Sequence, residues 1–528
     1  MKQRSKRSRA GRRRGKQPSA PWLTGRREAY IAGTLLALGC ALRLVALAAL
    51  PRGLNQDEAS SAYEALALLR SGMDRCGNPW PVLLVSWGSG QNALLSYLAI
   101  PLAAILGASE WTVRLPVALS GCLTLPVFWR LARMSRGPGF GLAALAILTV
   151  NPWHIMMSRW GLESNLLPFF LLTGVWLTAL AREKPWLLTG AAAAFGLSLY
   201  AYGTAFFFLP LFFCGALVLL RRNLRPVPFL TALAVFLLPA LPIGICQARN
   251  ALGLPAARFL CFTLPRLTEG RQAATSVLGG ASPLENLRDL LRILRTQSDG
   301  LIWNSLGIGK GGILYVFGLP AAVLGLVYAF RRRAWETEGF LLLALASALV
   351  CGVLIRVNIN RINMLWLPLI YFSALGLWAA LQKLRLWALL PAAGIAVCFA
   401  LFLSGYGAAL GRSGNANFFP GLGEAIRAAL AQNAGTVYVS NVVNQPYIFA
   451  LYYGEIPPET FVESVEYSDP DAAFRQVERF AGFEFSDPDR ADVLVLHGSE
   501  LAGRNVTGIY GSYYLCEVEP SEQETQTQ

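Results

Sequence analysis

Charged residues are scarce in this sequence. Only 15% of the 528 residues are charged and 54% are hydrophobic, and the mean hydropathy is +0.44. A soluble globular chain usually carries about 25% charged residues. Apolar runs long enough to cross a bilayer, roughly 20 residues each, recur along most of the chain without polar alternation. The composition therefore excludes a soluble protein and predicts a polytopic, all-α membrane protein.

Cysteine motifs are also absent, and no removable leader is expected. The nine cysteines are scattered, mostly inside apolar runs, and none forms a CxxC pair. Neither a disulfide framework nor a zinc site follows from them. The first apolar run, from Tyr30 to Leu50, has no small-residue cleavage site after a short apolar core, so we expect no removed signal peptide.

Basic residues are in excess, and their position gives the excess its meaning. The net charge is +15, and much of it lies in the first 27 residues, directly before the first apolar run. That placement argues against nucleic-acid binding, so we expect no nucleic-acid partner. It is typical of a cytoplasmic tail that fixes orientation and touches anionic lipid. We predict a basic cytoplasmic tail over residues 1–28.

Basic turns set the predicted topology, with the N-terminus inside and every internal turn carrying Lys or Arg. The apolar segment Gln91–Gly107 would invert every later turn if it spanned, so we expect it to lie in the interface, in a first outer loop with juxtamembrane helices. About eleven spans result, near residues 29–50, 115–131, 139–158, 165–181, 187–202, 204–220, 228–246, 312–330, 339–356, 362–381 and 386–408. Residues 29–410 form this membrane domain.

The composition changes after residue 410. A short helix is expected over Leu422–Gln432, and buried strands over Thr436–Ser440 and Asp492–Leu496. We predict a small extracytoplasmic α/β domain over residues 411–518, which would bind the acceptor or a partner, and a polar tail over residues 519–528.

Polar residues gather on the extracytoplasmic side of this topology. Arginine pairs well with phosphate oxygens, and a carboxylate can remove a proton from an incoming hydroxyl, so the set suits transfer from a lipid-phosphate donor. The set comprises Asp57, Glu58, Asp74, Gln91, Asn92, Arg114, Arg159, Glu163, Arg258, Arg266, Arg271, Arg356, Asn358, Asn360 and Arg361.

Several of these residues also have a structural interpretation. Asp57 could cap the helix that follows it, and Arg114 could simply extend from a span end toward the interface. Asp74 fits a turn. Glu163 lies four residues after Arg159, so the two could form an ion pair on one helical face.

The order of these motifs resembles the GT-C membrane glycosyltransferases. The motifs are Asp57-Glu58 after the first span, Arg114-Leu-Pro116 opening the second, and the run Asn151–Asn165. Over residues 28–380 the chain is most similar to glycosyltransferase family 39, which includes protein O-mannosyltransferases and bacterial aminoarabinose transferases of lipid A.

This resemblance implies an inverting transfer from a polyprenyl-phosphate sugar on the outer face. It assigns Asp57 as the base, with Glu58 and Glu163 positioning the acceptor or the base; Glu163 stands where the family often has Asp. Donor phosphate and substrate binding fall to Arg114, Arg159, Arg361, Gln91 and Asn92. No cofactor is required, although a divalent ion near Asp57, Glu58 and Glu163 stays open.

Expected partners are the polyprenyl-phosphate sugar, a lipid, polysaccharide or protein acceptor, and the bilayer of a bacterial cytoplasmic membrane. Two other classes remain open. A transporter or flippase for a lipid-linked sugar would carry charges near mid-membrane and internal repeats, which we do not find. A non-catalytic subunit of an envelope assembly would tolerate loss of Asp57.

Overall fold

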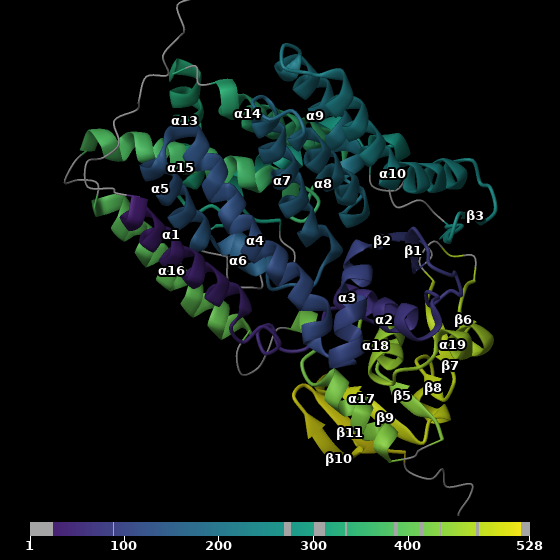
Figure 1. The fold of residues 1–528 in the computed structure, drawn as a ribbon. Helices are drawn as coiled ribbons and strands as arrows, with labels where there is room; N and C mark the ends of the chain where they lie inside the picture. The colour runs from purple at the N-terminus through teal and green to yellow at the C-terminus, as the bar shows by residue number, and fades with distance from the viewer. Residues whose placement is uncertain are drawn as a thin grey trace, which may run out of the picture.

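The structure is a computed structural model that describes residues 25–87, 89–268, 276–299, 312–332, 335–384, 389–410, 416–432, 435–470, 472 and 475–518. Most of the predicted basic tail, up to residue 24, and the predicted polar tail 519–528 lie outside the described residues. Helices form one large bundle, and a smaller sheet-containing region lies beneath α2 and α3 (Figure 1). The expected all-α membrane fold with a small C-terminal α/β region is confirmed.

The bundle helices occupy the predicted spans. Within the described ranges, six helices are long and apolar enough to cross a membrane, namely α4, α7 with the turn before it, α10, α14, α15 and α16. The count of eleven spans stays a prediction. The bundle elements are α1 (Gly25–Leu44), α4 (Glu110–Arg136), α5 (Pro138–Thr149), α6 (Pro152–Met157), η1 (Glu163–Leu166), α7 (Leu167–Ala181), α8 (Leu187–Ala201), α9 (Ala205–Leu220), α10 (Pro226–Ala251), α13 (Gly318–Arg332), α14 (Trp335–Leu354), α15 (Asn363–Leu384) and α16 (Leu389–Leu410).

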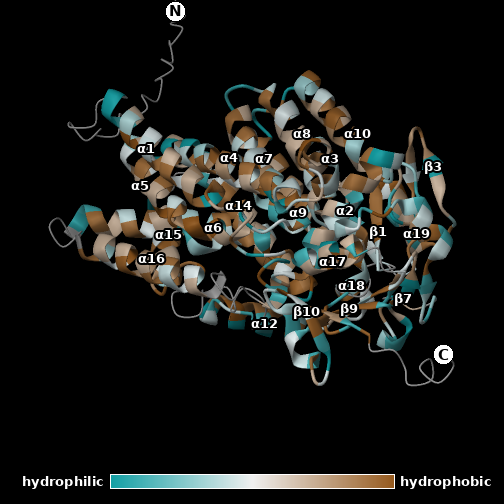
Figure 2. Cartoon of the chain, turned by 90° about the horizontal axis from the view of Figure 1, so that it is seen from below, coloured by the Kyte–Doolittle hydropathy of each residue, from teal (hydrophilic) through white to brown (hydrophobic). Residues whose placement is uncertain are grey.

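Two glycines set the closest helix pair. A Cβ at Gly325 of α13 would lie 1.9 Å from the carbonyl oxygen of Phe372, and one at Gly376 of α15 would lie 1.9 Å from that of Ala321. Without side chains at these positions the two backbones can touch, which is how small residues drive helix packing in membranes. Hydrophobic residues, drawn in brown, predominate in the bundle helices (Figure 2).

The predicted span 139–158 is broken. Helix α5 ends at Thr149 and α6 begins at Pro152, because Asn151 caps α6 by accepting a hydrogen bond from the His154 amide at 3.0 Å. Proline has no N–H and cannot continue the preceding helix. The break turns the chain into the segment that carries Arg159 and Glu163.

The predicted first outer loop contains two helices and a hairpin. Helix α2 (Gln56–Ser71) precedes the strands β1 (Leu83–Ser86) and β2 (Ser89–Asn92), and α3 (Leu94–Leu106) follows them. With 13 residues, α3 is about 20 Å long, too short to cross a bilayer. The expected juxtamembrane placement agrees with this length, but Gln91 and Asn92 lie on a strand that the sequence did not suggest.

Two further pieces belong to the side that is predicted to be extracytoplasmic. A hairpin of β3 (Ala257–Phe259) and β4 (Phe262–Leu264) is followed by α12 (Pro283–Thr296). A seven-stranded sheet has the order β10-β11-β9-β5-β8-β7-β6. Its elements are η5 (Ala416–Phe418), α17 (Leu422–Ala431), β5 (Val437–Val439), α18 (Pro446–Tyr453), α19 (Pro458–Ser464), β6 (Glu466–Tyr467), β7 (Val477–Phe480), β8 (Phe483–Glu484), β9 (Val493–His497), β10 (Asn505–Tyr510) and β11 (Tyr513–Glu517).

The predicted strands are the centre of this sheet. β5 pairs in parallel with β9, which places Val437 opposite Val493, and both strands are buried. α17 covers the predicted helix Leu422–Gln432 to within one residue. The apolar runs identified these elements correctly because each is short, buried and bounded by turn residues.

Candidate functional site

A pocket lined by β2, η1 and the turn before α15 joins three of the predicted site residues. Asn92 comes from β2, Glu163 from η1, and Arg361 from the turn between α14 and α15. The other lining residues are Leu83, Gly90, Tyr202, Gly203, Thr204, Phe207, Gln247, Leu267 and Ile355. A carboxylate, an amide and a guanidinium group therefore border one cavity, of about 60 Å³.

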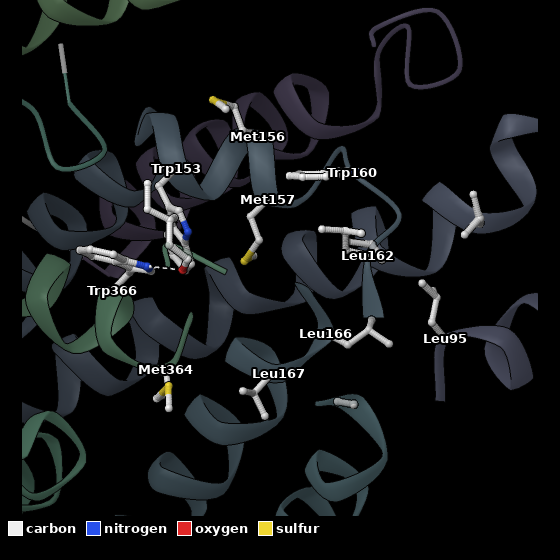
Figure 3. Close-up of a cluster of buried hydrophobic side chains, with 14 of the residues drawn as sticks. Leu95, Trp153, Met156, Met157, Trp160, Leu162, Leu166, Leu167, Met364 and Trp366 are labelled. Carbon is white, nitrogen blue, oxygen red and sulfur yellow. Dashed lines mark hydrogen bonds between the residues drawn. The ribbon is translucent and has the colours of Figure 1, made fainter. Parts of the chain in front are cut away.

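Glu163 owes its place to the packing around it. The residue opens the 3-10 turn η1 and is only 7% exposed. Figure 3 shows the neighbouring Trp160, Leu162 and Leu166 within a buried apolar cluster. The chain leaves the helical conformation between Arg159 and Glu163, so the expected pairing on one helical face is wrong.

Asn92 and Arg361 are held by backbone carbonyls. The side-chain amide of Asn92 donates from Nδ2 to Leu199 O of α8 at 2.9 Å, which fixes β2 to the bundle. Arg361 donates from Nη1 to Arg356 O at 3.2 Å, and its own amide donates to Asn358 Oδ1 at 2.8 Å. Arg361 is partly exposed and lines the pocket, so its cation can meet an anionic ligand there.

Asp57 lies in the first turn of α2 and is half-buried. The cap of this helix is Asn55, whose Oδ1 accepts a hydrogen bond from the Asp57 amide at 3.1 Å. The suggestion that Asp57 is the cap is therefore wrong. Asp57 is not among the residues that line the pocket with Glu163.

Glu58 is the centre of a buried clamp. Its carboxylate accepts hydrogen bonds from Arg114 Nε at 2.8 Å and Nη2 at 3.0 Å, from the Asn55 amide at 3.0 Å, and from the Gly161 amide at 2.8 Å. Four donors match the acceptor capacity of an ionised carboxylate. Both side chains are 0% exposed. Glu58 thus ties α2, α4 and the segment before Glu163 together.

Arg114 and Arg159 bind the main chain between α1 and α2. Arg114 also donates to carbonyls at the start of that segment, including Leu47 O at 3.2 Å and Pro51 O at 2.6 Å. Arg159 donates to four carbonyls from its two terminal nitrogens, those of Leu42, Val45, Ala46 and Leu50. Both arginines therefore contact the chain that leads to Asp57, and their expected contact with donor phosphate stays a prediction.

Gln91 has a similar structural role. It accepts from Ser60 Oγ at 2.9 Å and donates to Ser61 Oγ at 2.8 Å, and it is 3% exposed. Both partners lie in α2, so Gln91 joins the β1–β2 hairpin to the helix that carries Asp57. The structure brings Asn92, but not Gln91, to the pocket wall.

Sequence reasoning missed a second buried ion pair. Arg75 Nε donates to Glu64 Oε1 at 2.5 Å, and its Nη1 donates to Tyr447 Oη at 3.1 Å in α18. Arg75 thus links α2 to α18 in the C-terminal region. Its signal in the sequence is weak, because Glu64 lies in an ordinary helical run and its partner is eleven residues away.

Asp74 fits the predicted turn. It accepts hydrogen bonds from the amides of Cys76 at 3.0 Å and Asn78 at 2.8 Å. Burial, followed by the charge of Glu64, raises the pKa of the Asp74 carboxyl to about 7. Among the described residues, no group of three His, Cys, Asp or Glu side chains is placed to hold a metal ion.

Known proteins resemble this chain in part of its sequence and in its fold. A family model described as dolichyl-phosphate-mannose-protein mannosyltransferase matches residues 92–245. Curated protein sequences give no match.

Two solved structures of ArnT place the fold. ArnT from Cupriavidus metallidurans in the apo state has a TM-score of 0.57 at 13% identity, and ArnT bound to undecaprenyl phosphate has 0.55 at 14%; each match covers 93% of this chain and 99% of that chain. The apo oligosaccharyltransferase from Archaeoglobus fulgidus is less similar, with a TM-score of 0.48 at 13% identity over 83% of this chain and 65% of its own. The chain thus has the GT-C fold of ArnT, as its motifs indicated.

Proposed function

We propose that this protein transfers a sugar from a polyprenyl-phosphate donor to an acceptor hydroxyl or amine on the extracytoplasmic face, with inversion. The observation that carries the proposal is the pocket that gathers Glu163, Asn92 and Arg361, in a fold shared with ArnT. One solved ArnT structure holds undecaprenyl phosphate, a lipid of the proposed donor class.

The proposed chemistry uses two sets of groups. Asp57 takes the proton of the acceptor hydroxyl or amine as that atom forms a bond to the anomeric carbon. The bond from this carbon to the phosphate oxygen breaks, and polyprenyl phosphate leaves with the electron pair. Arg361 offsets the charge on the leaving phosphate, and Glu163 and Asn92 orient the sugar or the acceptor.

The clamp around Glu58 gives this site its order. Arg114 and Glu58 fix the first turn of α2, and Gly161 fixes the segment that leads to Glu163. The two segments with predicted catalytic carboxylates are therefore joined through one buried side chain. Such preorganisation lets electrostatic stabilisation and positioning supply most of the rate.

The test is sugar transfer from a panel of radiolabelled polyprenyl-phosphate sugars by purified protein, with and without EDTA. Wild type should transfer or slowly hydrolyse one donor, and Asp57→Asn should lose that activity by roughly 10²–10⁴-fold, the usual contribution of general acid–base catalysis. Asp289→Asn, in the solvent-facing pair with Arg292 on α12, is the matched control. A fully active Asp57→Asn variant would show that Asp57 is not the base.

A further inference from the structure

The first described residues of the C-terminal domain lie against the turn that carries Asp57. The segment is η5 (Ala416–Phe418), and it precedes the sheet by about 20 residues of chain. The Asn55 amide side chain donates to Asn417 O at 3.0 Å. Asn55 is also the cap of α2, so one side chain joins this segment to the helix start.

Gly53 brings the two backbones into contact. Its φ is +80°, and a Cβ at this position would lie 2.1 Å from Phe418 O. Only glycine fits such a position, because any other side chain would clash with the carbonyl and adopt a strained φ. The turn before Asp57 is therefore shaped to the backbone of Phe418.

The Phe418 ring reaches the second acidic segment. The ring is 0% exposed and lies edge-on to Trp160, with ring centroids 5.7 Å apart. The Arg114 guanidinium carbon lies 5.9 Å from its centroid. Trp160 stands three residues before Glu163, and Arg114 holds Glu58. One ring thus touches both sides of the clamp.

We infer that Phe418 is a positioning residue, which fixes the position of the Asp57 segment relative to the Glu163 segment. Through this residue the C-terminal domain contributes to the geometry of the site. This inference rests on the proposed function for its effect on turnover. An aromatic ring in a buried junction of this kind fixes geometry because neither segment can shift without losing packing. A small displacement of catalytic groups lowers the turnover rate far more than it weakens substrate binding.

The experiment compares Phe418→Leu with Phe480→Leu in the full-length protein. Phe480 is equally buried, at 2% exposure, but its rings of contact are Phe461, Phe483 and Phe485 inside the C-terminal domain. Each variant removes the same side-chain atoms from a buried position. Only Phe418→Leu removes a contact to the acidic segments.

Two readings are taken, hydrogen exchange by mass spectrometry without donor, and steady-state kinetics. Phe418→Leu should speed amide exchange in residues 53–59 and 160–166 by about tenfold or more. It should lower kcat by about tenfold or more while the donor KM stays within about twofold. Phe480→Leu should leave both segments and kcat as in wild type.

Unchanged exchange at residues 53–59 in Phe418→Leu, or equal loosening in Phe480→Leu, would overturn the inference. Unchanged kcat in a loosened Phe418→Leu variant would do the same. If wild type uses no donor, the proposed function fails, and the exchange data alone decide whether Phe418 positions these segments.

Discussion

At the scale of single residues, chemically similar groups near Asp57 have different tasks. Glu58 accepts four hydrogen bonds and is 0% exposed, whereas Asp57, one residue earlier, is half-buried in the first turn of α2. The arginines divide in the same way. Arg114 and Arg159 bind carbonyls of the chain, and Arg361 borders the pocket. We therefore place the reactive groups at the partly open positions.

Replacement of Arg361 tests the phosphate contact. Arg361→Gln should raise the donor KM and lower kcat/KM by roughly ten- to a hundredfold, because a hydrogen bond to a charged group contributes about 1.5–3 kcal/mol. Steady-state kinetics with the active donor measure this. Arg356→Gln, an exposed neighbour that does not line the pocket, is the control. Equal kinetic effects in both variants would remove the special role of Arg361.

Asp74 predicts a pH effect on stability. Its pKa is raised to about 7 in the folded chain, whereas an unfolded chain releases this proton near pH 4. Between these values the folded state holds more protons, so the stability that Asp74 contributes falls as pH rises from about 4 to about 7. In the variant Asp74→Asn, the side chain keeps an oxygen that can accept hydrogen bonds from the backbone amides of Cys76 and Asn78.

Melting temperatures of wild type and Asp74→Asn across that window provide the measurement. The variant should gain on wild type as pH rises from 5 to 7, and the difference should then level off. A difference that is constant with pH would show that Asp74 titrates in the same range in both states.

At the scale of elements, the turn between α1 and α2 is held from three sides. Arg114 and Arg159 bind its carbonyls, Asn55 caps the helix that follows, and Phe418 lies against Gly53. Arg114, Arg159 and Phe418 reach the turn from three different parts of the chain, whereas Asn55 is the last residue of the turn itself. Loss of one should loosen the turn without unfolding the bundle.

Asn55 separates the cap from the contact with the C-terminal domain. Asn55→Ser keeps a hydroxyl that can cap α2 but loses the donor to Asn417 O, whereas Asn55→Ala loses both. The cap alone contributes about 1 kcal/mol. We expect Asn55→Ala to melt below Asn55→Ser, and both to lose turnover. Identical melting of the two variants would contradict the capping role.

Elements that depend on local sequence could be predicted, whereas elements that depend on contacts far along the chain could not. Apolar runs located the bundle helices, β5, β9 and α17, because burial of a local run is visible in sequence. The break at Asn151 and Pro152 had a local signal that the run of apolar residues hid. The β1–β2 hairpin was missed because Ser89–Asn92 is polar and its burial comes from neighbours far along the chain.

The site was predictable only in part. Asn92, Glu163 and Arg361 were identified as polar residues on one side of the membrane, and they share a pocket. The hydrogen-bond partners of Arg114, Arg159 and Gln91 could not be predicted from the sequence, because tertiary packing determines them. Phe418 has no local signal at all, because it acts through residues more than 250 positions away.

At the scale of the whole molecule, the predicted orientation places the pocket and the sheet on the extracytoplasmic side. Arg222→Cys in the turn between α9 and α10, and Val442→Cys in the exposed turn after β5, report on the two sides. With the exposed Cys261 changed to Ser as background, an impermeant thiol reagent should label Val442→Cys in intact spheroplasts. Arg222→Cys should react only after permeabilisation, and the reverse pattern would invert the topology.

The most direct measurement compares Asp57→Asn and Glu58→Gln in parallel, by melting temperature and by turnover of the active polyprenyl-phosphate sugar. Asp57→Asn should melt like wild type and lose turnover by roughly 10²–10⁴-fold. Glu58→Gln should melt well below wild type, because breaking a buried ion pair costs about 3–5 kcal/mol. If Asp57→Asn turns over like wild type, or Glu58→Gln melts like wild type, the division between a reactive Asp57 and a structural Glu58 is wrong.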